Sequence, residues 1–136
     1  MKGIQTYLNF DGNCREAMTF YKECLGGEVF FLPFSQGPIK FPEGAENRIL
    51  HARLNQGTAA LMASDTMPGM AFEPGNNFSV SLGCDSLEEL ERVFNAFSQK
   101  GKVTMPLQDT FWGARFGMVT DQFGISWMFD FEHPKK

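Results

Sequence analysis

A chain of 136 residues, 43% hydrophobic and 21% charged, is long enough for one domain with its own core and too apolar to be disordered. A net charge of −4 and an isoelectric point near 5.1 argue against nucleic acid or an anionic membrane as the main partner. Fifteen phenylalanines and eight methionines indicate an apolar pocket or a subunit interface, with a Phe-rich core as the simpler alternative.

The three cysteines show no paired spacing. No signal segment opens the chain, and no apolar run approaches 18 residues, so a cytoplasmic protein with reduced thiols is expected. No histidine or other base lies near Cys14, Cys24 or Cys84 in the sequence. A buried structural role is therefore favoured over a nucleophilic one.

For the first half of the chain, the sequence predicts one strand, one helix and three further strands. Asn13 and Glu16 have the spacing of a capping box, and Gly26-Gly27 ends the helix that follows. A Gly/Pro-rich loop, residues 35–47, precedes the third strand. The expected strands are Ile4–Phe10, Glu28–Phe34, Arg48–Leu54 and Ala59–Asp65.

Alternation within these strands predicts which residues share a face. In the first strand, Tyr7 is expected on one face, and Leu8 and Phe10 on the other. In the third strand, the alternation separates two sets of residues, Leu50, Ala52 and Leu54 on one face and Ile49, His51 and Arg53 on the other.

The same order returns after a second Gly/Pro-rich loop. Ser86 and Glu89 form a second capping box, and Asp121 to Gly124 has the pattern of a hairpin turn. Phe78 is expected to face inward and Ser79 outward. The expected strands are Phe78–Cys84, Lys102–Leu107, Phe116–Thr120 and Ile125–Phe131.

This duplication predicts the fold class. We expect a single α+β domain, residues 1–136, in which two β-α-β-β-β units (about 1–66 and 77–132) form a curved mixed sheet around a cleft.

Motifs along nearly the whole chain carry a family resemblance. They are Tyr7-Leu8, Phe10, Gly12-Asn13, Glu16-Ala17, Phe20-Tyr21, Leu25-Gly26, His51-Ala52, Leu54, Ser64-Asp65, Met105-Pro106-Leu107, Trp112-Gly113, Phe116-Gly117, Asp121, Phe123-Gly124 and Trp127. Together they resemble the vicinal oxygen chelate superfamily of glyoxalase I, extradiol dioxygenases, fosfomycin-resistance enzymes and bleomycin-binding proteins. Within it, they are most similar to the PhnB-like branch, often labelled 3-demethylubiquinone methyltransferase-like.

The resemblance implies four metal-ligand positions, usually two histidines and two glutamates. In this chain they fall at Gln5, Met62, Ser79 and Met128, which we expect to bind the small-molecule ligand in the cleft instead. An amide, a hydroxyl and two thioethers are poor ligands for a hard divalent cation. This difference from the usual ligand set therefore predicts no bound metal and no cofactor. It also argues against the metal-dependent reactions of the superfamily.

Other side chains remain as candidates for chemistry. His51 and Tyr7 are candidates for proton transfer, with a structural histidine as the alternative. Arg53 and Arg115 are candidates for holding an anion, with an ion-paired or solvated arginine as the alternative. The remaining ligand-binding candidates are Ser64, beside Asp65 at the end of its strand, and Trp112, whose indole can stack on a planar ligand.

These residues favour the hypothesis of a metal-independent small-molecule-binding protein of the glyoxalase/bleomycin-resistance type, from the PhnB-like branch. The alternatives are a small-metabolite enzyme that uses His51 and Tyr7 for proton transfer, and a structural or regulatory dimer. We expect a small-molecule ligand and a homodimer, and neither nucleic acid nor membrane as partner.

Overall fold

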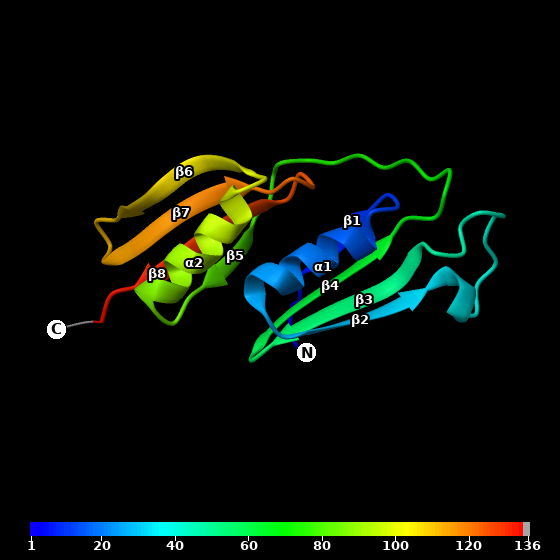
Figure 1. Cartoon of the computed structure of the whole chain (residues 1–136), viewed down its shortest axis with the longest axis horizontal. Helices are drawn as coiled ribbons and strands as arrows, with labels where there is room; N and C mark the ends of the chain where they lie inside the picture. The colour runs from blue at the N-terminus through cyan, green and yellow to red at the C-terminus, as the bar shows by residue number, and fades with distance from the viewer. Residues whose placement is uncertain (135–136) are drawn as a thin grey trace. The chain divides into compact units, whose positions relative to one another are not determined.

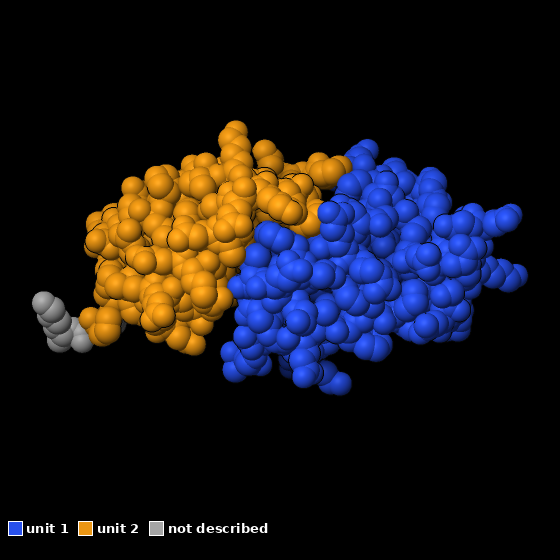
Figure 2. All heavy atoms as spheres, in the orientation of Figure 1, with its two compact units in different colours: residues 1–73 blue, residues 74–136 orange. Residues whose placement is uncertain are grey.

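The computed structural model describes residues 1–134, and the chain divides into two compact units (Figures 1 and 2). The first unit is Met1–Glu73, and the second begins at Pro74. The boundary between them lies inside the Gly/Pro-rich loop expected from the sequence. No helix within residues 1–134 is long and apolar enough to cross a membrane.

The first unit is one helix packed on a four-stranded sheet (Figure 1). Its strands run in the order β1-β4-β3-β2, with β1 parallel to β4 and the other pairs antiparallel. The helix α1 contacts β2, β3 and β4. The elements are β1 (Tyr7–Phe10), α1 (Cys14–Leu25), β2 (Glu28–Pro33), a 3-10 turn (Phe34–Gln36), β3 (Ile49–Gln56) and β4 (Ala59–Asp65).

The second unit repeats this arrangement. Its strand order is β5-β8-β7-β6, β5 is parallel to β8, and α2 contacts β7 and β8. The elements are β5 (Val80–Gly83), α2 (Leu87–Ser98), β6 (Lys102–Asp109), β7 (Ala114–Thr120) and β8 (Ser126–Glu132). Two mixed sheets with the same strand permutation confirm the predicted α+β fold of two β-α-β-β-β units.

Each helix buries the apolar face of its own sheet. In the second unit, the Phe97 ring lies 4.8 Å from that of Trp127 and 5.1 Å from that of Phe129, centroid to centroid. The helix-side core of the first unit is Leu8, Phe10, Ala17, Met18, Tyr21, Ala52, Leu54, Leu61 and Ala63. Because side chains alternate along a strand, the residues between these core positions lie on the other face of each sheet.

Buried carboxylates hold the ends of the strands. Asp65 accepts hydrogen bonds from the backbone N–H groups of Gly12 (2.8 Å), Cys14 (3.0 Å) and Ile49 (2.8 Å). The capping box predicted at Asn13 is therefore wrong, since Asn13 makes no side-chain cap and the acceptor comes from β4. The predicted cap at Ser86 is confirmed, because its hydroxyl accepts from the backbone N–H of Glu89 at 3.0 Å.

The hairpin turn before β8 forms as the sequence predicts. One Asp121 oxygen accepts from the backbone N–H of Phe123 (2.9 Å) and Ile125 (3.0 Å), and the other accepts from the Trp127 indole at 2.9 Å. Gly124 closes the turn with a φ of 86°, a conformation that other residues rarely adopt. Asp121 thus ties the turn to the buried face of β8.

The predicted alternation fails in two places. The pairing of β2 with β3 steps from His51 to Ile49, so Leu50 is an extra residue in a β-bulge. The bulge leaves Ile49 fully buried and Leu50 half-buried, contrary to the predicted faces. Phe78 precedes β5 and is 56% exposed, so its predicted inward position is also wrong.

Replacing Asp121 with alanine should lower the free energy of unfolding by about 1–3 kcal/mol, because buried donors lose their acceptor. Urea unfolding followed by tryptophan fluorescence measures this loss. The matched control is Gln122→Ala at the exposed neighbouring position, which should change stability by less than about 0.5 kcal/mol. Equal stabilities of the two variants would contradict the structural role of Asp121.

Candidate functional site

The candidate site is the face of the first sheet that α1 does not cover. The strand register places Tyr7, Met62, Arg53 and Phe30 in one row across β1, β4, β3 and β2. Directly opposed side chains on a sheet face lie about 4.5–5.5 Å apart at Cβ. In the adjoining row, Leu32 lies opposite His51, and Asn9 opposite Ser64. We call this surface, defined by Tyr7, Phe30, His51, Arg53, Met62 and Ser64, the open face.

Tyr7 and His51 form a hydrogen-bonded pair on the open face. The Tyr7 hydroxyl lies 3.1 Å from Nδ1 of His51, and the two rings stack with centroids 5.8 Å apart. The two residues are 44 positions apart in sequence, and they meet because β4 lies between β1 and β3. Either ring tautomer can make this contact, because Nδ1 can accept from the Tyr7 hydroxyl or, when it carries hydrogen, donate to it. The hydrogen-bonding proton can thus belong to the hydroxyl or to the imidazole.

Arg53 is half-buried beside this pair. Its Nε donates to Oδ1 of Asn55 at 3.0 Å, and its Nη1 donates to the sulfur of Met62 at 3.6 Å. No carboxylate within residues 1–134 lies in ion-pair distance of it. A thioether is a weak acceptor, so most of the guanidinium remains available to a ligand.

The second sheet presents a different surface on the side away from α2. Its register aligns Ser81, Met128, Met118 and Met105 across β5, β8, β7 and β6. Met128 therefore lies among thioethers, while Met62 lies beside an arginine in the first unit. This surface is soft and largely uncharged along the methionine row.

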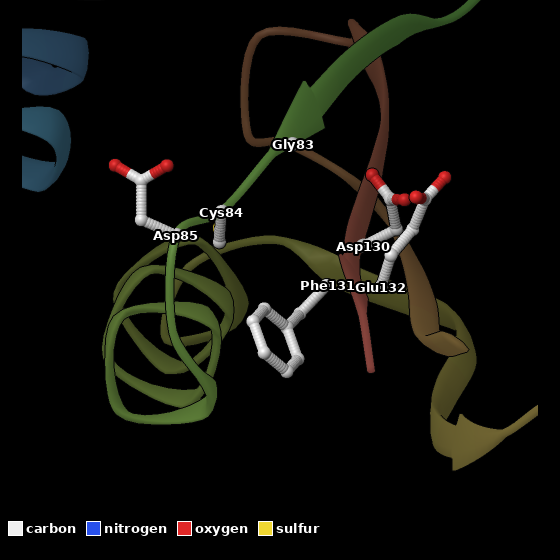
Figure 3. A pocket seen from close by; sticks show the side chains of 6 residues that line it. All are labelled: Gly83, Cys84, Asp85, Asp130, Phe131 and Glu132. Atoms are coloured by element: carbon white, nitrogen blue, oxygen red, sulfur yellow. The ribbon is translucent and has the colours of Figure 1, made fainter. Parts of the chain in front are cut away.

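A depression of about 470 Å³ lies at the ends of β5 and β8 (Figure 3). Figure 3 shows the carboxylates of Asp130 and Glu132 on the same side of β8, with Phe131 on the other. Burial, and to a lesser degree the charge of Glu132, raises the pKa of Asp130. Burial also raises the pKa of the Cys84 thiol in this depression to about 11, which leaves it protonated and unreactive at neutral pH.

The remaining cysteines are also structural in character. Cys14 is fully buried, and burial, reinforced by the charge of Asp65, raises its pKa to about 12. Cys24 is buried on the same helix. These environments agree with the structural role expected from the sequence.

Four of the predicted site residues lie off these two surfaces. Gln5 and Ser79 precede β1 and β5 and are exposed. Trp112 is 59% exposed in the turn between β6 and β7. Arg115 pairs across the sheet with Phe131, on the side opposite Met128, and its Nη1 lies 3.5 Å from Oδ1 of Asp109. For Arg115, the structure shows the ion-paired alternative.

The donor chemistry does not suit a divalent cation. The positions implied by the resemblance supply one amide, one hydroxyl and two thioethers, and two of these residues lie outside the strands. Within residues 1–134, no group of three or more His, Cys, Asp or Glu side chains is placed to hold a metal ion.

Arg48 has a structural role that the sequence analysis missed. Its Nη2 donates to the backbone oxygen of Thr66 at 2.6 Å and pairs with Asp11 at 2.8 Å, and this hydrogen bond lowers the pKa of Asp11. These contacts join the turn after β1 to the end of β4. Only the position of Arg48 at the start of a strand was visible in the sequence.

Comparison with known proteins decides the family. Residues 3–129 match the Glyoxalase/Bleomycin resistance protein/Dioxygenase superfamily. The chain belongs to this superfamily. The superfamily's vicinal oxygen chelate fold is the fold described above.

Similar proteins match this superfamily member over more than nine-tenths of its length. Protein PA1353 from Pseudomonas aeruginosa is 45% identical, with a TM-score of 0.85 over 97% of this chain and 100% of that one. Protein YjdN from Escherichia coli is 36% identical over 92% of both chains. The PhnB protein from Bacillus cereus, which carries a 3-demethylubiquinone-9 3-methyltransferase name, is 27% identical, with a TM-score of 0.72 over 96% of this chain and 99% of that one. The predicted likeness to the superfamily and its PhnB-like branch is confirmed.

Replacing Tyr7 with phenylalanine should shift the Nδ1 resonance of His51 in ¹⁵N NMR spectra, because the ring loses its hydroxyl partner. The cost in stability should not exceed about 1 kcal/mol, since the pair is exposed. His133 is an internal control, since it hydrogen-bonds Asp109 and should keep its signals. An unchanged His51 Nδ1 resonance would show that the hydrogen bond is absent in solution.

Proposed function

We propose that this superfamily member is a metal-independent small-molecule-binding protein, PhnB-like, whose ligand lies on the open face. The observation that carries the proposal is the Tyr7–His51 pair, 3.1 Å apart and adjacent to Met62 and Arg53. Ligand sites combine apolar surface with a few polar groups that fix orientation. The open face has this composition, because Phe30 and Met62 lie among the polar side chains of Tyr7, His51, Arg53 and Ser64.

Metal independence is supported by the ligand positions themselves. The family resemblance implies imidazole and carboxylate groups at four metal-ligand positions, whereas this chain has Gln5, Met62, Ser79 and Met128 there. Binding then depends on hydrogen bonds and apolar contact with the protein's own side chains. Homodimer formation and a cytoplasmic location stay predictions from the sequence.

A second candidate function is proton transfer on a small metabolite. It is favoured by the direct contact between a phenol and an imidazole, two groups that can exchange a proton with each other and with a bound molecule. In this case His51 is the base or acid, and Tyr7 sets its orientation or relays the proton.

A thermal-shift screen of small organic molecules, confirmed by NMR, tests the binding function. Ligands that stabilise the chelator-washed wild type should move the backbone resonances of Tyr7, His51, Arg53 and Met62. His51→Ala should weaken their binding about tenfold, the effect of losing one good hydrogen bond. The matched control, His133→Ala, removes the other imidazole and should bind as the wild type does.

Two outcomes would contradict the proposal. One is a complete absence of stabilising ligands, and the other is binding that moves only resonances outside the first sheet, β1 to β4. Following the bound molecule over time separates the two candidate functions. A ligand that stays intact supports binding alone, whereas conversion that His51→Gln stops supports the enzyme.

A further inference from the structure

We propose that the natural ligand of the open face is an apolar organic acid, whose carboxylate pairs with Arg53 while its apolar part lies across Met62 and Phe30. This inference rests on the proposed function and narrows the class of ligand. Two observations support it: the Arg53 guanidinium has no carboxylate partner within residues 1–134, and Phe30 and Met62 lie on either side of Arg53 in the same row.

The arginines of the chain differ in their carboxylate partners. Arg48 and Arg115 each have a carboxylate partner, Asp11 at 2.8 Å and Asp109 at 3.5 Å. Arg53 has no such partner within residues 1–134, although it is half-buried. A partly desolvated guanidinium without a counter-charge attracts an anion more strongly than an exposed one.

One acidic side chain shares the open side of β2 with Phe30. Glu28 lies opposite Asn55 on the same face, one step along β2 from Phe30, and is exposed. It comes within ion-pair distance of neither Arg53 nor any other described base. Asn55 instead accepts the Nε hydrogen bond, which leaves the Nη groups as donors on the open face.

Exposed aromatic rings stand at both ends of the row that contains Arg53. Phe30 is 59% exposed and Tyr7 42% exposed, on either side of Arg53 and Met62 in the same row. Strands lie about 4.8 Å apart, so the row spans about 14 Å. It therefore places a cation between two aromatic rings, a surface suited to a molecule with an acid group and an apolar body.

The methionine surface of the second sheet provides a contrast. Its rows hold Met105, Met118 and Met128, with Asp130 opposite Phe116. Lys102, opposite Thr120, is exposed, whereas Arg53 on the first sheet is half-buried. An acid is repelled by Asp130 there, while the chain as a whole carries a net charge of −4. On the open face, the attraction for an anion comes from Arg53.

A matched pair of probes tests the inference. 2-Naphthoate and 2-naphthamide have the same ring system and differ in charge. NMR titration of the full-length wild type should give an affinity about tenfold to a hundredfold higher for the acid, because a hydrogen bond to a charged group is stronger than a neutral one. Both probes should move the amide resonances of Tyr7, Arg53 and Met62.

Arg53→Gln should reduce the preference for 2-naphthoate to less than about threefold. Arg15→Gln is the matched control, because it removes the same charge from the helix-covered side of the sheet, where the exposed Arg15 stacks on Phe31. It should leave the preference unchanged. Thermal unfolding of both variants verifies that each is folded.

Equal binding of the two probes, or a preference that survives in Arg53→Gln, would overturn the inference. If both probes still move the open-face resonances equally, the binding function stands and only the acid class fails. If neither probe moves them, the inference also fails, and the separate screen of small organic molecules decides the binding function.

Discussion

Each four-stranded sheet of this chain is covered by a single helix, and this constraint determines where function can lie. One helix buries one face, and in both units that face carries the aliphatic and aromatic core. Because side chains alternate along a strand, every second residue points to the other face. Tyr7, His51, Arg53 and Met62 are brought together by that alternation and by a strand order that places β4 between β1 and β3.

A buried carboxylate also fixes the strands that carry the candidate site. Asp65 follows Ser64 on β4, and it binds the backbone of Ile49 at the start of β3 and of Gly12 and Cys14 before and within α1. The same side chain thus fixes the ends of β3 and β4, the strands that carry His51 and Met62. Arg48 adds contacts from the start of β3 to Thr66 and Asp11. A polar network behind the open face therefore holds its strands in register.

Much of the fold could be predicted from the sequence because local patterns and tertiary packing agree. The end of α1 at Gly26, the cap at Ser86, the Asp121–Gly124 turn and the duplication all follow from residue spacings within short stretches of the chain. The errors arose where a distant residue overrides the local pattern. Asp65 takes the capping role expected of Asn13, and the bulge at Leu50 changes the side to which Ile49 points.

The candidate site was predicted in part. Alternation alone places His51 and Arg53 on one face, but their contacts with Tyr7 and Met62 require the register between strands distant in sequence. The same applies to Arg115, whose partner Asp109 lies on a neighbouring strand. The spacing of residues in the sequence does not show which arginine has a carboxylate partner. It therefore cannot distinguish Arg115, which pairs with Asp109, from Arg53, which has no carboxylate partner within residues 1–134.

The central claim is that the open face holds an organic molecule with its own side chains and without a metal ion. Elemental analysis tests it most directly, using full-length protein that has been washed with a chelator, incubated with Zn²⁺, Ni²⁺, Mn²⁺ or Fe²⁺, and desalted. The account predicts far less than one ion per chain for each metal. One tightly held ion per chain, lost on His51→Ala and kept on His133→Ala, would contradict it.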